Sequence, residues 1–145
     1  MGIIEERLSE GSPESTRSQL GAAVAKLPDR GVLVLRLSFD PRAVMAWIAE
    51  RGHRVEVGAQ ARGEWSLAIQ CPTAPEILDL RDLEAPEPLE RILLEVAELL
   101  PGGVLLARTP RLPRMLIPQL ERRALEWTAV EEPDASGLVW VRRPA

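Results

Sequence analysis

Apolar residues in the second half of the chain recur with the spacings of alternating strands and helices. Strands are predicted at residues 77–81, 104–109, 126–131 and 138–142. One helix opens at residues 84–88, and another runs from Pro113 to about Ala124. Pro118 lies inside the second helix and predicts a kink or a late start, because proline lacks a backbone donor. The predicted order is therefore βαβαββ.

The first half shows the same order more faintly. Its elements are predicted as a helix after Ser12-Pro13, a strand at 32–39, a helix from Asp40-Pro41 to Gly52, and a hairpin of 54–58 and 65–70. The first strand is the uncertain element. Residues 3–7 are the sole candidate for it, and the strand is either absent, lent by another chain or formed by these residues.

An internal repeat relates the two halves. A shift of 72 positions sets residues 31–36 over residues 103–108, and Pro41-Arg42 over Pro113-Arg114. The repeat predicts two α/β units in tandem that form a pseudo-dimer. Residues 1–71 form the first and residues 76–145 the second, joined by a short linker at 72–75.

Composition excludes several classes of protein. At 145 residues with 46% hydrophobic residues, the chain has enough apolar material for a packed core. One cysteine and one histidine are too few for a disulfide or a structural zinc site, so we expect no metal and no cofactor. A net charge of −4 argues against nucleic acid as a partner. No apolar run reaches membrane-spanning length and the amino terminus lacks a signal-peptide pattern, so we expect no membrane partner and a cytoplasmic location.

Residues 78–89 carry a motif at the junction of a strand and a helix. This segment resembles the start of a TusA-like sulfur-carrier domain, in which an Asp-x-Arg-Gly-Leu strand leads into a Cys-Pro-x-Pro helix start. The matching positions are Asp79, Arg81, Leu83, Pro86 and Pro88. Asp82 replaces the glycine, and Ala85 stands where that family has its cysteine.

The second half as a whole resembles an uncharacterised, cysteine-lacking branch of the TusA-like domains. The resemblance covers residues 76–144 and, through the repeat, residues 12–70 more loosely. It implies a two-layer sandwich, with two helices on one face of a four-stranded mixed sheet. It also implies a surface that docks onto partner proteins. Because sulfur transfer needs a persulfide on a thiol, Ala85-Pro86-x-Pro88 is a vestige of the carrier motif.

The densest basic region provides the candidate contact site. Arg108, Arg111 and Arg114 lie where a strand passes into a helix, a geometry that favours an anion, and Arg36 and Arg42 echo two of them in the first half. The alternative is a solvated rim without a ligand.

The cysteine, the histidine and the tryptophans are the remaining residues that could bind or react with a ligand, and each also has a structural interpretation. Cys71 is either an inert, partly buried thiol or a relocated sulfur-carrying thiol, and His53 is expected at a surface turn. The tryptophans are expected to pack in the core rather than stack on ligands: Trp47, Trp65, Trp127 and Trp140.

These features together favour a non-enzymatic binding or adaptor module that contacts an anionic ligand or a partner protein through its arginines. The alternative function is a sulfur-relay or redox accessory protein that uses Cys71 or a partner's cysteine. Homo-oligomer formation, the pathway and the packing of the two halves stay open.

Overall fold

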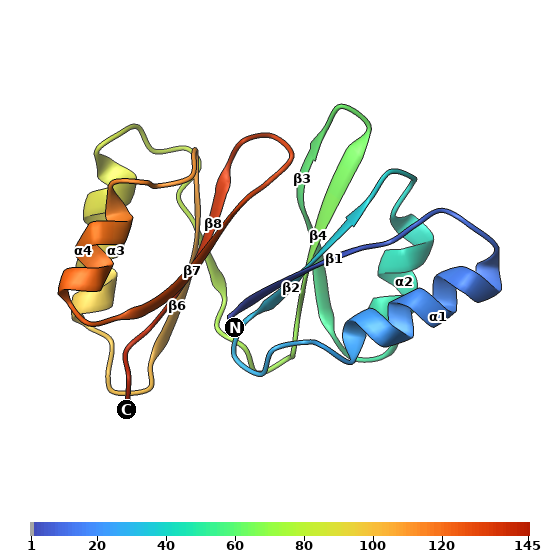
Figure 1. Ribbon diagram of the computed structural model, residues 1–145, viewed down its shortest axis with the longest axis horizontal. Coiled ribbons are helices and arrows are strands. Elements are labelled where there is room, and N and C mark those ends of the chain that lie inside the picture. Colours follow the sequence, from blue (N-terminus) through green and yellow to red (C-terminus); the bar gives the residue numbers. More distant parts are fainter. Residues whose placement is uncertain (1) are drawn as a thin grey trace. The chain divides into compact units, whose positions relative to one another are not determined.

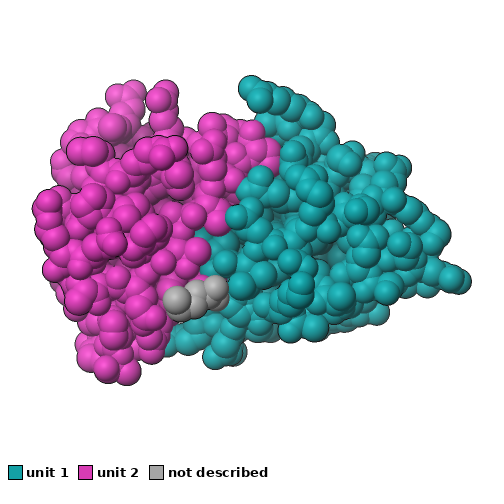
Figure 2. All heavy atoms as spheres, viewed as in Figure 1, with its two compact units in different colours: residues 1, 3–74 teal, residues 2, 75–145 magenta. Residues whose placement is uncertain are grey.

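A computed structural model describes residues 2–145 and divides them into two compact units. Unit 1 comprises residues Ile3–Ala74 and unit 2 comprises residues Pro75–Ala145 (Figure 2). Within the described residues, each unit contains four strands and two helices in the order βαβαββ. The predicted pair of similar α/β units is confirmed.

Unit 1 is a mixed four-stranded sheet with two helices on one face (Figure 1). Its elements are β1 (Ile3–Arg7), α1 (Pro13–Val24), β2 (Val32–Leu37), α2 (Arg42–Glu50), β3 (Arg54–Ala61) and β4 (Glu64–Gln70). The strand order is β1-β2-β4-β3, in which β1 runs parallel to β2 and the other pairs are antiparallel. A parallel pair needs a long crossover, and α1 supplies it.

Unit 2 has the same layers and the same topology. Its elements are β5 (Ile77–Asp79), α3 (Glu87–Ala97), β6 (Val104–Thr109), α4 (Leu116–Arg122), β7 (Glu126–Glu131) and β8 (Gly137–Arg142). The strand order is β5-β6-β8-β7, with β5 parallel to β6. Both helices again cover one face of the sheet (Figure 1).

The first strand of unit 1 is present and belongs to the chain itself. β1 pairs with β2 from Ile3 opposite Val32 to Arg7 opposite Arg36. Just beyond the strand, the Leu8 amide donates to the Arg36 carbonyl at 2.8 Å. The Leu80 amide donates to the Arg108 carbonyl at the same 2.8 Å, 72 residues along the chain. The alternatives of a missing or borrowed strand are therefore wrong, and the offset of 72 residues also holds at the first strand.

Each unit has its own apolar core between the helices and the sheet. In unit 1, alternate β2 residues face the helices and lie fully buried: Leu33, Leu35 and Leu37. In unit 2 the core combines sheet and helix residues: Ala107, Val139, Val141, Ile92, Val96, Leu116 and Leu120. Burial of these side chains supplies the main favourable term in folding.

Several element boundaries differ from the prediction by a few residues, and the differences in α4 and β5 have local reasons. The predicted helix from Pro113 begins at Leu116, so Pro118 falls in the first turn, where a missing amide donor costs nothing. The late start expected from Pro118 is thus confirmed. The predicted strand 77–81 ends at Asp79, because the Asp79 side chain accepts the Arg81 amide at 3.1 Å and turns the chain.

The helices of residues 2–145 are 7 to 12 residues long. None of them is long and apolar enough to cross a membrane.

Candidate functional site

Three connections of unit 2 meet at one edge of its sheet. β5 and β6 are parallel neighbours, so the segments that follow them, residues 80–86 and 110–115, leave from the same edge. β8 is antiparallel to β6 and pairs Gly137 with Thr109, which places the β7–β8 hairpin at this edge too. We call this region the carboxyl edge of unit 2. Ligand sites in open α/β sheets commonly lie outside the carboxyl ends of the strands.

The segment that resembles a carrier motif, residues 85–88, begins at this edge. Ala85 and Pro86 are exposed, Pro88 is buried, and α3 begins at Glu87. The first turn of α3 also contains Glu90. A methyl group cannot hold sulfur, and two carboxylates in the first turn oppose the thiolate that a helix amino terminus would otherwise stabilise. In unit 1, Ser12 caps α1 by accepting the Ser15 amide at 3.1 Å, with no thiol at the matching place.

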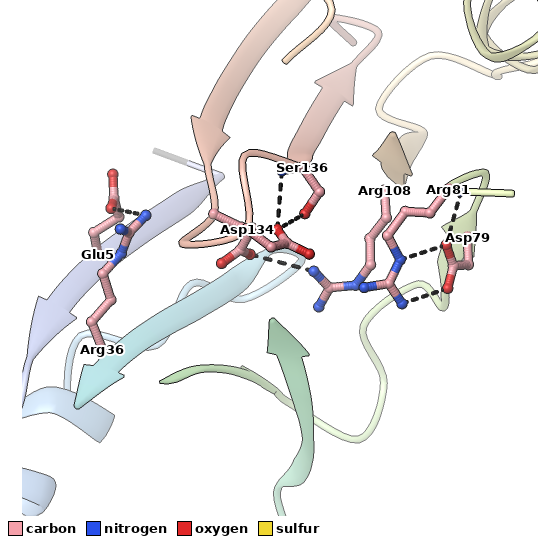
Figure 3. Close-up of polar contacts among 8 residues, drawn as sticks. Glu5, Arg36, Asp79, Arg81, Arg108, Asp134 and Ser136 are labelled. Atoms are coloured by element: carbon pink, nitrogen blue, oxygen red, sulfur yellow. Dashed lines mark hydrogen bonds and ion pairs between the residues drawn. The ribbon is translucent and has the colours of Figure 1, made fainter. Parts of the chain in front are cut away.

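The Asp-x-Arg signature of the strand forms a closed local ion pair. Asp79 Oδ1 accepts from Arg81 Nε at 2.9 Å, and Asp79 Oδ2 accepts from Arg81 Nη2 at 2.7 Å (Figure 3). The Arg81 hydrogen bond to the carboxylate lowers the pKa of Asp79 below its usual range, against desolvation, which raises it. The signature residues thus satisfy each other and shape the turn.

Arg108 is buried beside this pair. Its side chain is 2% exposed, and its Nη1 lies 3.3 Å from Oε1 of Glu132, which is 1% exposed (Figure 3). A buried guanidinium with a carboxylate beside it is not available to a ligand from solution. The expectation of Arg108 as part of an exposed contact surface is therefore corrected, because sequence showed neither its burial nor its partner 24 residues away.

The hairpin that carries Glu132 is held by its own polar contacts. Asp134 Oδ1 accepts from the Ser136 amide at 3.0 Å and from the Ser136 hydroxyl at 2.5 Å (Figure 3). Desolvation raises the pKa of Asp134, but the hydrogen bonds from Ser136 and the backbone, together with the charge of Arg81, outweigh it and leave that pKa lowered.

Arg36 occupies the place in unit 1 that Arg108 occupies in unit 2. Its Nη2 lies 3.1 Å from Oε2 of Glu5 on the neighbouring strand, and the Arg36 side chain is 20% exposed. These two residues, with Glu6 and Arg7, line an open pocket of about 330 Å³. The lining carries both signs of charge, so the pocket offers no excess of positive potential to an anion.

Arg42 is exposed, but its guanidinium already forms an ion pair with Asp40. Its side chain is 88% exposed, and its Nη2 lies 2.6 Å from Oδ2 of Asp40. The Asp40 carboxylate also accepts the Arg42 amide at 3.0 Å, as Asp79 accepts that of Arg81. The hydrogen bond from Arg42 lowers the pKa of Asp40. Sequence analysis missed this contact, although the shared Asp-x-Arg spacing could have revealed it.

Arg111 and Arg114 are the remaining predicted arginines, and both are exposed. Across residues 2–145, neither guanidinium has a carboxylate within ion-pair distance. They lie on residues 110–115, which we call the arginine loop. This loop follows β6 at the carboxyl edge, so the structure supplies two accessible cations there.

The arginine loop is anchored to the sheet. The hydroxyl of Thr109, which is 1% exposed, donates to the Arg111 carbonyl at 2.5 Å. Gly137 lies directly beneath the loop: a Cβ there would stand 2.6 Å from Thr109 Oγ1 and 3.0 Å from both the Arg111 carbonyl oxygen and the Leu112 Cα. The loop backbone is therefore fixed, while its arginine side chains are exposed.

Cys71 and His53 are the remaining candidate residues. Cys71 follows β4 as a partly buried free thiol, and His53 is partly buried before β3. Among residues 2–145, no three His, Cys, Asp or Glu side chains converge as a metal site.

Comparison with known proteins identifies a family for one unit. Residues 77–143 match the family described as "Uncharacterized conserved protein (DUF2249)". The match covers β5 to β8, so unit 2 is similar to this family over nearly its whole length. No curated protein matches the chain. The relation to sulfur carriers stays a prediction from the motif.

Replacement of Gly137 by alanine tests the anchoring of the loop. We expect Gly137→Ala to lower the free energy of unfolding by about 1–3 kcal/mol, because Cβ collides with Thr109 and the loop backbone. Gly21→Ala in α1, where a Cβ meets no atom within 4 Å, is the control and should be neutral or stabilising by up to about 1 kcal/mol. Urea unfolding measures both variants. Equal effects would show that no close approach exists at Gly137.

The Asp79–Arg81 pair predicts a pH dependence of stability. Since the folded state lowers the pKa of Asp79, the pair stabilises the protein above the unfolded value of about 3.9, and this contribution is lost as the pH falls through the folded pKa. The Asp79 side chain is 51% exposed, so Asp79→Asn should cost only about 0.5 kcal/mol at neutral pH.

Urea unfolding at neutral pH and at about pH 2.5 measures this difference, which should become smaller in acid. Asp82→Asn, at an exposed neighbour, is the matched control and should change little at either pH. A cost of Asp79→Asn that persists unchanged in acid would contradict the electrostatic explanation.

Proposed function

We propose that this protein is a non-enzymatic binding or adaptor module that contacts an anionic ligand or a partner protein through Arg111 and Arg114. The proposal is supported by the likeness of residues 78–89 to the start of a sulfur-carrier domain, with Ala85 at the position of the carrying cysteine. The observation that carries the proposal is the exposure of two arginines without carboxylate partners on an anchored loop.

The chemistry of this edge supports binding rather than catalysis. A guanidinium stays protonated at all physiological pH values, so it provides charge and hydrogen-bond donors but does not exchange protons. The thiol of the carrier motif is absent, and the neighbouring Asp79–Arg81 pair is closed on itself. The arginines are therefore suited to recognise a negative group, not to transform it.

The anchored backbone favours recognition. A segment that is already ordered loses less conformational entropy when it binds, so more of the interaction energy is available as affinity. Thr109 and Gly137 hold the loop from below, and the side chains of Arg111 and Arg114 remain adjustable.

A sulfur-relay or redox accessory role is the second candidate. It is supported by Cys71, a free thiol that is partly exposed. Such a role needs a thiolate that accepts sulfur from a donor, and a partner's cysteine could complete the relay.

Neutral variants of the arginine loop test the main proposal. We expect the double variant Arg111→Gln/Arg114→Gln to lose binding of a fluorescein-labelled polyglutamate peptide or of inorganic phosphate, because both free cations are removed. Fluorescence anisotropy and calorimetry measure binding, and affinity for the wild type should fall with added salt. The thermal melt should stay almost unchanged, since both side chains are exposed.

Arg122→Gln, at an exposed position of α4, is the matched control and should bind like the wild type. Binding that survives in the double variant, or a wild type that binds neither probe, would overturn the proposal. A collapsed melt of the double variant would assign the two arginines a structural role instead.

Intact-mass analysis separates the two candidate functions. After incubation with a persulfide donor and a sulfurtransferase, we expect no added sulfur on the native chain, because Ala85 holds no thiol and Cys71 is partly buried. A gain of one sulfur that disappears in Cys71→Ala would favour the sulfur-relay role.

A further inference from the structure

The internal repeat provides a direct comparison for the arginine loop. Residues 39–42 of unit 1 read Phe-Asp-Pro-Arg, and residues 111–114 of unit 2 read Arg-Leu-Pro-Arg. The proline and the final arginine are identical, so Arg42 and Arg114 are equivalent. The two segments differ in charge: one aspartate and one arginine cancel in unit 1, whereas two arginines give +2 in unit 2.

In unit 1, the Asp40 carboxylate pairs with the guanidinium of Arg42. Oδ2 of Asp40 accepts from Arg42 Nε at 2.9 Å and from Nη2 at 2.6 Å, and Oδ1 accepts from the Arg42 amide at 3.0 Å. The Asp79–Arg81 pair has the same spacing and nearly the same distances. An aspartate two positions before an arginine thus closes that arginine at both of these places.

In unit 2, the equivalent position is Leu112, whose side chain has no group that accepts a hydrogen bond. The backbone carbonyl of Leu112 accepts the Arg114 amide at 3.0 Å, so the turn is kept without a side-chain carboxylate. The nearby acids Asp82 and Glu84 are exposed and form no ion pair with Arg114 within residues 2–145. Arg114 is consequently open where Arg42 is closed.

We infer that Leu112 keeps Arg114 open for an acidic side chain of a partner protein, whose carboxylate takes the place that Asp40 holds beside Arg42. This inference rests on the proposed function and names its partner as an acidic peptide segment. The matching loop of unit 1 is closed to the same segment by its own aspartate. One chain therefore binds one segment, through unit 2.

The apolar neighbours of the arginines favour a peptide over a small anion. Met115 follows Arg114 and is 79% exposed, and Leu112 is partly exposed between the two arginines. A phosphate ion gains nothing from these side chains, whereas a peptide that carries an apolar residue buries part of them. Arginine suits such a ligand because its planar fork matches a carboxylate in two hydrogen bonds.

Grafting the unit 1 sequence onto unit 2 tests this inference. Leu112→Asp creates the Asp-Pro-Arg segment found at residues 40–42, and Leu112→Asn is the uncharged control of the same shape. The probe is a short fluorescein-labelled peptide of glutamates around one leucine. We expect Leu112→Asp to weaken its binding by about fivefold or more, because the new carboxylate competes within the chain, and Leu112→Asn to weaken it far less.

The reverse substitution in unit 1 should make Arg42 available to the peptide. Asp40→Leu removes the occupying carboxylate from Arg42, so calorimetry should detect a second, weaker site for the same peptide. Adding Arg42→Gln to Asp40→Leu should return the stoichiometry to one peptide per chain. A thermal melt of each variant shows whether a loss of peptide binding comes from unfolding of the protein.

The outcomes separate this inference from the proposed function. If Leu112→Asp binds the peptide as Leu112→Asn does, the inference is overturned, although loss of binding in Arg111→Gln/Arg114→Gln would still support the proposed function. Binding of inorganic phosphate without binding of the peptide also overturns the acidic-segment partner alone. If neither Arg111→Gln/Arg114→Gln nor Leu112→Asp changes the binding of the peptide, both this inference and the proposed function are overturned.

Discussion

Parallel pairing of the first two strands is the constraint on which each unit depends. The pairing of β5 with β6 requires a helical crossover, and it directs the segments after both strands to one edge of the sheet. The same pairing of β1 with β2 repeats the arrangement in unit 1. The segment that contains Ala85 and the arginine loop leave from the same edge because of this pairing, although they lie far apart in the sequence.

In both units, ion pairs with carboxylates determine which arginines remain available to a ligand. Arg108 lies beside Glu132 in the interior of unit 2, Arg42 is held by Asp40, and Arg36 lies beside Glu5. Buried ion pairs contribute little net stability because desolvation opposes the attraction, and exposed ones contribute little because water screens them. These pairs therefore matter more for the charge they remove from the surface than for the stability they add.

The elements of the fold could be predicted from the sequence because hydrophobic spacing and turn residues are local signals. The βαβαββ order, the β6 bounds and the late start at Pro118 followed from such signals. The availability of the arginines did not follow, because it depends on tertiary contacts. Arg108 and Arg111 are three residues apart in one basic run, yet one is buried and the other is exposed. Burial depends on strand alternation and on Glu132, which lies 24 residues away from Arg108.

Close packing at Gly137 fixes the backbone of the arginine loop independently of the side chains that the loop exposes. Because the loop backbone rests directly on the sheet at this glycine, its path does not depend on the side chains that it exposes. Substitutions at positions 111, 112 and 114 can therefore change charge and hydrogen-bonding groups while the backbone that carries them stays in place. A duplicated unit with such a loop can acquire a new ligand through a few surface substitutions, without any change to the core that keeps it folded.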